Sequence, residues 1–373
     1  MKRIYRKMRT ISLVLALAVI LTGMGEVQAE EAVGTWLHTD SGWMFMYPDQ
    51  TYATNTWIGR SYVDANGIRT RRLKSTKYEI PDYYLTQLHN TVRGVNKLDG
   101  DWSSFAIITD THGDGQRTQN VLRYLLDHSK VSKCFWLGDL CSGNFDQTGK
   151  KEYMTSRKDL LSYRNRIYVT IGNHDRKSDK DYRKEDLGIV YRDFLKGKRE
   201  LKGCPNDFYY YFDEPKTKLR YLVLNTSNCM RDQRKMDRAE LKWLREEALQ
   251  LPAEDWSVVI FGHLDIDPNS DLPYKSRDSY LLAELIIAAK VKVAGYFCGH
   301  EHLDAQSRVA GRFYQNVLTS DGIRKGQSGR IEGTVHDGAV TVVSVNSRTG
   351  KVIFRRIGMP TDGKLKNYNY RSK

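Results

Sequence analysis

Five apolar runs of this 373-residue chain each end in carboxylate, amide or imidazole side chains. In chain order they read SFAIITDTHGDG, SKCFWLGDLCSG, RIYVTIGNHDR, WSVVIFGHLDID and VKVAGYFCGHEHLDA. Amphipathic segments such as TQNVLRYLLDHS lie between them, and this alternation of strand-like and helical patterns predicts a layered α/β domain. Ligands of such domains sit at the carboxyl ends of the strands, so the five polar ends are expected to meet at one site.

Each of these ends carries residue types that bind divalent metal ions. His300 and His302 flank one glutamate, and residues two apart in an extended segment project to the same side. Taken singly, each position has an ordinary explanation, such as a helix cap, a turn residue or a histidine bonded to the backbone. Together, those explanations require five coincidences at the same place in the topology. The candidate metal ligands are Asp110, His112, Asp139, Asn173, His263, His300 and His302.

The ordered blocks Asp-x-His, Gly-Asp, Gly-Asn-His-Asp, His and Gly-His-x-His resemble the calcineurin-like metallophosphoesterase superfamily, over about Phe105 to His302. The resemblance implies a four-layer α/β/β/α sandwich with two divalent metal ions at the strand ends. It also implies that the first ion is held by Asp110, His112 and His302. The second would be held by Asn173, His263 and His300, with Asp139 bridging the pair.

Two further residues receive catalytic roles from this resemblance. His174 would approach the scissile phosphate without binding metal, and Asp175 would orient it. The chemistry is consistent with the residue types, because a phosphate ester repels hydroxide and two cations both lower the charge and supply hydroxide near neutral pH. A mixed nitrogen and oxygen shell suits Mn, Fe or Zn.

The sequence departs from the superfamily pattern at two places. A second aspartate often follows the Gly-Asp block, and here the positions read Leu140-Cys141-Ser142; a His-His-Pro block is replaced by Gly262-His263-Leu264. The metal ligands survive both changes, whereas the substrate wall differs. We expect Asp265, Asp267 and a solvated insertion, 176–199, to shape the entrance.

The chain opens MKRIYRKMRTISLVLALAVILTGMGEVQAEEA, which joins a basic start, an apolar run and a small-residue site. This layout predicts a secretory signal peptide over residues 1–29; an uncleaved anchor is the alternative. Since no comparable run recurs, we expect no membrane span after cleavage and a secreted or cell-surface protein. The net charge of +14 favours polyanionic partners, although no basic-aromatic nucleic-acid motif occurs.

Residues 34–69 are rich in aromatic and turn-forming residues and predict short β-hairpins. Thr-Trp-Leu recurs as Thr-Trp-Ile 21 residues later, and the segment resembles the cell-wall-binding, or choline-binding, repeats of Gram-positive surface proteins. That resemblance implies an aromatic cage for a quaternary ammonium, built on Trp43, Tyr47 and Trp57. Fewer than two copies are present, so a simple surface appendage is the alternative.

The rest of the chain divides by composition. Residues 70–100 are a basic stretch and a connecting helix, which starts near Pro81 and Asp82. Residues 101–360 form the expected metallophosphoesterase domain, and residues 361–373 a flexible tail.

The leading functional hypothesis is an exported dimetal phosphoesterase that hydrolyses a phosphomonoester or phosphodiester, at a Gram-positive envelope. One alternative is a cell-surface binding protein that uses the repeat-like segment and keeps the phosphoesterase domain as a scaffold. Another is hydrolysis of pyrophosphate. The strand-end motifs do not decide between substrates, since they recognise the phosphoryl group that all of them share.

Overall fold

The structure, a computed structural model, describes residues 34–54, 56–58, 61–64, 66–70, 78–113, 115–175, 187–227, 234–320 and 331–371. The predicted signal peptide, 1–29, lies outside these residues. The chain divides into two units, Met1–Arg72 and Leu73–Lys373. Within the described residues, no helix has both the length and the apolar composition that crossing a bilayer requires.

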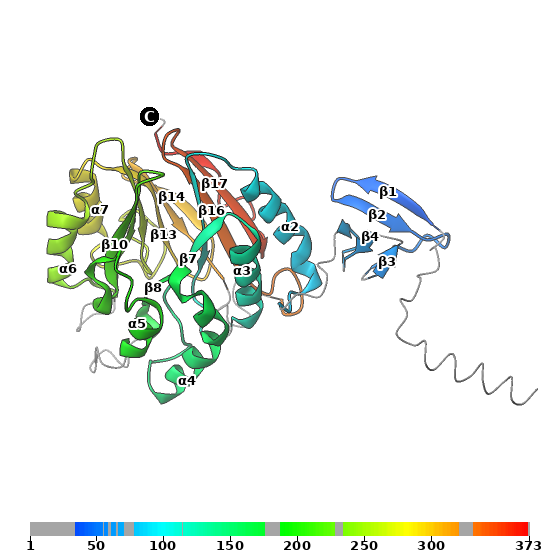
Figure 1. The fold of residues 1–373 in the computed structure, drawn as a ribbon, viewed down its shortest axis with the longest axis horizontal. Helices are drawn as coiled ribbons and strands as arrows, with labels where there is room; N and C mark the ends of the chain where they lie inside the picture. The colour runs from blue at the N-terminus through cyan, green and yellow to red at the C-terminus, as the bar shows by residue number, and fades with distance from the viewer. Residues whose placement is uncertain are drawn as a thin grey trace, which may run out of the picture. The chain divides into compact units, whose positions relative to one another are not determined.

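Two stacked sheets carry the larger unit (Figure 1). One has the strand order β18-β17-β16-β6-β7-β8, in which β6, β7 and β8 are parallel. Its strands are β6 Trp102–Ile108, β7 Val131–Leu137, β8 Ile167–Thr170, β16 Ala339–Asn346, β17 Lys351–Gly358 and β18 Tyr368–Asn369.

The other sheet has the order β14-β15-β13-β12-β11-β10-β9, with β11, β12, β13 and β15 parallel. Parallel strands must be buried on both faces, which explains why the sequence shows continuous apolar runs here rather than alternation. Its strands are β9 Lys202–Cys204, β10 Tyr209–Glu214, β11 Leu219–Val223, β12 Ser257–Phe261, β13 Lys292–Cys298, β14 Ala305–Val309 and β15 Phe313–Val317.

Aromatic rings fill the space between the two sheets. Phe135 of β7 stacks on Phe261 of β12 with ring centroids 3.7 Å apart. Phe105 of β6 meets Tyr221, Phe261 and Phe297 edge to face. Each of these rings is fully buried, and such contacts add to the hydrophobic stabilisation of the interface. The core therefore fixes how the strand ends of one sheet face those of the other.

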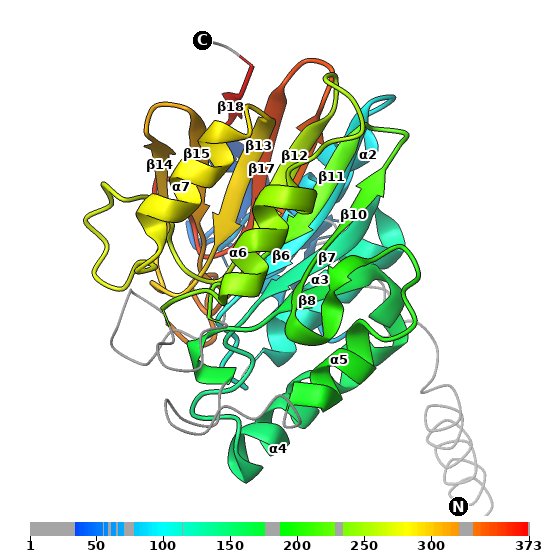
Figure 2. The same cartoon turned by 90° about the vertical axis from the view of Figure 1, so that its left-hand side faces the viewer.

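Helices cover the outer face of each sheet and complete four layers, α/β/β/α, as predicted (Figures 1 and 2). On one side α2 lies against β17, and α3 lies against β7 and β16. On the other side α6 and α7 pack on β11, β12 and β13 in a second apolar cluster. The helices are α2 Asp82–Asn96, α3 Gln116–His128, α4 Gln147–Ser156, α5 Gly188–Phe194, α6 Arg238–Trp243 and α7 Ser279–Ala288.

Two expectations about flexible segments are wrong for the residues described. The predicted tail contributes β18, and Tyr368 in it is buried and donates its hydroxyl to the carbonyl of Ala294. The insertion 176–199 is not solvated throughout, because Val190 and Phe194 of α5 are buried in the main core. In both segments a few apolar side chains, separated by many charged residues, pack against parts of the fold that are distant in sequence.

The smaller unit contains two antiparallel sheets. The first pairs β1 (Thr35–Thr39) with β2 (Gly42–Met46), and the second has the order β3-β4-β5. Its core is a small cluster of Phe45, Ala53, Ile58 and Val63. The remaining strands are β3 Thr56–Ile58, β4 Ser61–Val63 and β5 Arg69–Thr70.

Tyr47, one of the three expected cage residues, packs its ring edge to face on Phe45 at 5.5 Å and joins this cluster. Trp43 is 44% exposed and meets the ring of His38. The side chain of Trp57, the third, lies outside what the structure describes. Trp36 has the guanidinium of Arg69 over its ring at 5.1 Å.

Candidate metal centre

The predicted ligands follow the carboxyl ends of five strands that meet at one edge of the sandwich. Three of these strands, β6, β7 and β8, belong to one sheet, and β12 and β13 belong to the other. Each first ligand comes two or three residues after its strand ends. Parallel strands place their carboxyl ends at the same edge, so segments about 190 residues apart become neighbours.

Six of the seven predicted ligands form two groups, in each of which the ligand atoms lie within 4.8 Å of one another. Asp139 belongs to both groups, at the position expected for a bridging carboxylate. The first group is Asp110, His112, Asp139 and His302, and the second is Asp139, His263 and His300.

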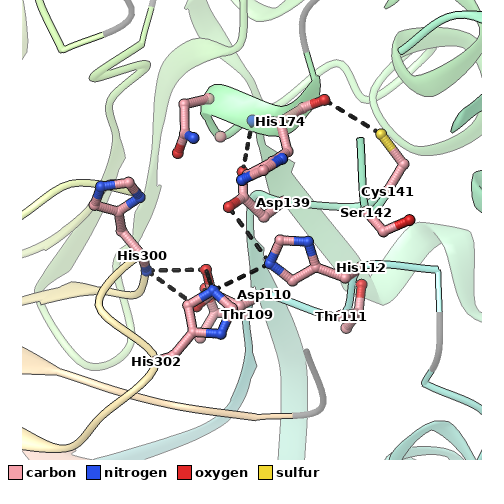
Figure 3. A network of polar contacts seen from close by, with 12 residues as sticks. Thr109, Asp110, Thr111, His112, Asp139, Cys141, Ser142, His174, His300 and His302 are labelled. Atoms are coloured by element: carbon pink, nitrogen blue, oxygen red, sulfur yellow. Dashed lines mark hydrogen bonds and ion pairs between the residues drawn. The ribbon is translucent and has the colours of Figure 1, made fainter. Parts of the chain in front are cut away.

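The ligand atoms within each group lie close together (Figure 3). Nε2 of His112 lies 3.1 Å from Nε2 of His302 and 3.6 Å from Oδ2 of Asp139. Nε2 of His263 lies 3.3 Å from Oδ1 of Asp139 and 3.0 Å from Oδ1 of Asn173. Asn173, the seventh predicted ligand, thus joins the second group through its amide oxygen.

Neighbouring groups fix how these ligands are turned. Nδ1 of His263 faces the carbonyl of Leu137 at 2.8 Å, which leaves Nε2 directed into the cluster. The backbone N–H of His300 donates to both carboxylate oxygens of Asp110, at 2.9 and 3.0 Å. The hydroxyl of Thr109 donates to the same carboxylate at 2.8 Å.

The backbone of the site is strained. Of the eleven described non-glycine residues with positive φ, five are predicted ligands. Left-handed backbone costs free energy for residues with a Cβ atom and clusters at functional sites. The strained turns after the strands therefore bring these side chains together at the edge of the sandwich. The five are Asp110 (φ 51°), His112 (44°), Asp139 (49°), His300 (72°) and His302 (54°).

Two glycines let the ligand loops approach this closely. A Cβ atom at Gly172 would lie 2.1 Å from Oδ1 of Asp139, and one at Gly299 would lie 2.3 Å from Oδ2 of Asp110. Both distances are far shorter than van der Waals contact. The glycines of the Gly-Asn-His-Asp and Gly-His-x-His blocks are thus required by packing around the carboxylates.

Electrostatics favour a neutral ring at two of the histidine ligands and an anion at the shared carboxylate. Burial lowers the pKa of His112 and lowers that of His300 to about 3, and both shifts favour the neutral ring, which presents a lone pair. Burial acts against the charge of Asp139, yet the attraction and hydrogen bond of His263 outweigh it and hold the pKa of Asp139 far below its usual value. Burial in turn lowers the pKa of His263, but Asp139 raises it overall to about 9. The shared carboxylate is therefore an anion.

Buried polar atoms without partners show that the cluster fits metal ions. Oδ2 of Asp139 and both ring nitrogens of His300 are buried and have no hydrogen-bond partner. Such groups are costly unless something else binds them. Carboxylate, imidazole and amide donors are suitable ligands for Mn, Fe or Zn. We conclude that the residues present fit a pair of divalent ions.

His174 lies beside this cluster and belongs to neither group. Its ring is 4.9 Å from that of His112, and its backbone N–H donates to Oδ1 of Asp139 at 2.9 Å (Figure 3). Asp175 does not orient the ring, contrary to expectation. Its fully buried carboxylate accepts instead from the backbone N–H groups of Leu140, at 2.6 Å, and Gly172, at 2.7 Å. Asp175 therefore fixes two ligand loops.

A cavity of about 570 Å³ opens over the cluster. Asp265 and Asp267, expected at the entrance, are buried and do not line it; they bond within their own loop and, in the case of Asp265, to Gln315 of β15. The sequence patterns did not predict the apolar part of the wall. Its one feature visible in the sequence is an aromatic residue, Tyr274, in the polar loop that follows His263. The predicted lining residues are His112, Asp139, Asn173, His174, His300 and His302, and the others are Pro273, Tyr274, Glu301 and Leu303.

Comparisons with known proteins agree with this geometry. The family model of the calcineurin-like phosphoesterases matches residues 103–304. A search of curated proteins found no significant match. Among solved structures, a dimetal phosphatase from Danio rerio is similar to 72% of this chain and 98% of its own, at 12% identity and a TM-score of 0.52. That likeness shows a shared fold.

Two further solved structures match less closely. A 5'-nucleotidase from Candida albicans aligns over 71% of this chain and 53% of its own, at 16% identity and a TM-score of 0.44. GAP50, described as the anchor in the inner membrane complex of Plasmodium, aligns over 71% of this chain and 91% of its own, at 12% identity and a TM-score of 0.42.

Proposed function

The chain belongs to the calcineurin-like phosphoesterase family, and from that premise we propose that it hydrolyses a phosphomonoester or phosphodiester outside the cell. It is a hydrolase of phosphoric esters whose family works with two divalent ions. One observation carries the assignment of the ligands: two groups of metal-binding side chains share the buried Asp139 at the floor of an open cavity.

The residues divide the work between the floor and the side of the cavity. When bound, the two ions acidify a water molecule and polarise the phosphoryl oxygens. Asp139 belongs to both ligand groups, and its Oδ1 accepts from the backbone N–H of His174. That bond also fixes the backbone position from which the His174 side chain extends. A proton on this ring can pass to the leaving oxygen, or its charge can stabilise the transferring group.

Metal analysis together with an ester assay tests this function. The full chain should carry near two equivalents of Mn, Fe or Zn and hydrolyse a chromogenic phosphodiester or monoester, and EDTA should stop the reaction. Asp139→Asn should lose both metal and activity, because a neutral amide cannot bridge two cations. Asp101→Asn is the matched control. Asp101 forms an ion pair with Arg348 and lies just before β6, at the end of the strand opposite to the metal ligands. A metal-free chain that still hydrolyses esters would refute the proposal, as would a metal-loaded chain without activity.

Export to a Gram-positive envelope is the second part of the proposal. The amino-terminal layout over residues 1–29 supports secretion, and the net charge of +14 supports contact with anionic wall polymers. The full chain and a chain lacking residues 1–29 can be expressed in a Gram-positive host and assayed in medium, wall and cytoplasm. We expect only the full chain outside the cytoplasm. Equal distribution of the two would contradict export.

Binding of choline through the smaller unit is the third part. The exposed Trp43 supports it, since quaternary ammonium groups bind to open aromatic faces. The full chain should then be retained on a choline-bearing resin and eluted by free choline.

A further inference from the structure

The cavity over the cluster has two kinds of wall. Its floor and one side are imidazole, amide and carboxylate groups, as described above. Another part of its lining is apolar and consists of Pro273, Tyr274 and Leu303. A phosphoric ester also has two parts, an anionic phosphoryl group and an organic leaving group. The polar floor suits the phosphoryl group, and the apolar wall suits the organic leaving group.

Tyr274 dominates the apolar wall. Tyr274 is 58% exposed, which is unusual for a large aromatic residue. Of the large hydrophobic residues that are exposed in the described part of the chain, it is the one that lines this cavity. Its ring stands at 83° to that of His300, with centroids 5.9 Å apart. A leaving group attached to a phosphoryl group at the His300 side of the floor would therefore lie within reach of this ring.

The loop that carries Tyr274 is held in place before any substrate binds. The backbone N–H of Tyr274 donates to Oε1 of Glu301 at 3.0 Å, which ties the loop to the residue between the two ligand histidines. Nζ of Lys275 donates to the carbonyls of Pro268 and Ser270, at 2.7 and 2.9 Å.

Earlier in the same loop, the carboxylate of Asp265 accepts from Nε2 of Gln315 and from the backbone N–H of Asp267, at 2.5 and 2.6 Å. The carboxylate of Asp267 accepts in turn from the backbone N–H of Asn269 at 3.1 Å. Little conformational entropy is then lost when a ligand packs against the loop.

We propose that Tyr274 is a specificity-determining residue that packs against a planar, aromatic leaving group, so the chain prefers phosphoric esters of aryl or nucleobase-bearing alcohols to esters of small polyols. This inference rests on the proposed function, because it names the substrate class of the same site. A flat ring and an aromatic leaving group bury apolar area and interact favourably as rings, whereas a hydrated polyol gains little from that surface.

The test compares two esters and two phosphonates on the metal-loaded full chain. For phenyl phosphate, Tyr274→Ala should lower kcat/KM by about tenfold, and Tyr274→Phe should keep it near the parent value. For glycerol phosphate, neither variant should change kcat/KM more than about twofold. Tyr280→Ala is the matched control, since Tyr280 is 71% exposed on α7 and does not line the cavity. Metal content and melting temperature should be equal in all variants.

Binding separates this inference from the proposed function. Calorimetry should show that the parent binds phenylphosphonate more tightly than methylphosphonate, and that Tyr274→Ala removes the difference. That result supports the inference even if no ester is hydrolysed, which would sink only the proposed function. Equal losses on both esters in Tyr274→Ala would overturn the inference. So would a Tyr274→Phe protein that loses as much as Tyr274→Ala, because the hydroxyl group rather than the ring would then matter.

Discussion

The metal-binding edge of the sandwich and the small amino-terminal unit were both predicted from recurring residue types, and they differ in what the fold does with them. At the edge, side chains from five strands converge on Asp139, and buried polar atoms remain without hydrogen-bond partners. In the small unit, two of the aromatic residues, Tyr47 and Trp36, pack on Phe45.

The difference teaches that convergence from distant segments is stronger grounds for function than local repetition. Aromatic residues in neighbouring hairpins have an alternative use, since they can supply the core of a unit that has few other apolar residues. Carboxylates and imidazoles buried together have no such use. They destabilise the fold unless a ligand binds them, so their presence points to one.

The largest effect that would sharpen this contrast is metal removal. EDTA should abolish hydrolysis and lower the melting temperature of the full chain, because an ion that binds only the folded state stabilises it by about 4 kcal/mol at a thousandfold excess over Kd. Calorimetric melting with and without added Mn or Zn checks this. Identical curves would mean that the buried cluster does not need an ion.

His174→Ala should lower kcat by about 10²- to 10⁴-fold with metal content unchanged, because it removes a proton donor and no ligand. Steady-state kinetics and metal analysis on the same sample measure both quantities. His38→Ala, in the small unit beside Trp43, serves as the control and should leave kcat unaltered. Loss of metal in the His174 variant would show that this ring is a ligand after all.

Gly172→Ala should lower kcat/KM by about a hundredfold, since the new methyl group must displace the Asp139 carboxylate and the facing ring of His263. Gly143→Ala is the matched control, because a Cβ atom there meets nothing within 4 Å. If both variants keep the parent rate, the close packing of the ligand loops is not needed for catalysis.

The smallest effect is expected in the small unit. Trp43→Ala should change the free energy of unfolding by about 1 kcal/mol or less, since the residue is 44% exposed, and should leave hydrolysis intact. Phe45→Ala, at a buried ring, should cost about 3–5 kcal/mol in the same unit. Denaturant unfolding measures both. If Trp43→Ala also weakens retention on a choline resin, the binding proposal is strengthened; unchanged retention would exclude Trp43 from it.

Most ligands of the metal centre could be predicted because the pattern that identifies each one lies within a short segment of sequence. Each ligand follows its own apolar run within a few residues, so the pattern of run and polar end is visible without the fold. Asp175 shows the limit of that reasoning. Its neighbour His174 suggested a side-chain pair, but the carboxylate turned to backbone N–H groups of Leu140 and Gly172, one of them from another loop.

Tyr274 and Tyr368 mark the same limit elsewhere in the chain. Nothing in a polar loop tells which aromatic residue will line a cavity, and nothing in a charged tail tells which will be buried. Tyr274 is placed by a bond to Glu301, and Tyr368 by one to Ala294, both far away in sequence.

By itself, the sequence determined that this chain forms layered strands and helices and that metal-binding groups stand at the strand ends, since hydrophobic periodicity and residue chemistry are carried by short segments. Tertiary structure decided which groups share the Asp139 carboxylate, which atoms remain without partners and what lines the rest of the cavity. The physical reason is that these properties depend on distances between residues far apart in the chain, which only the packing of the two sheets sets.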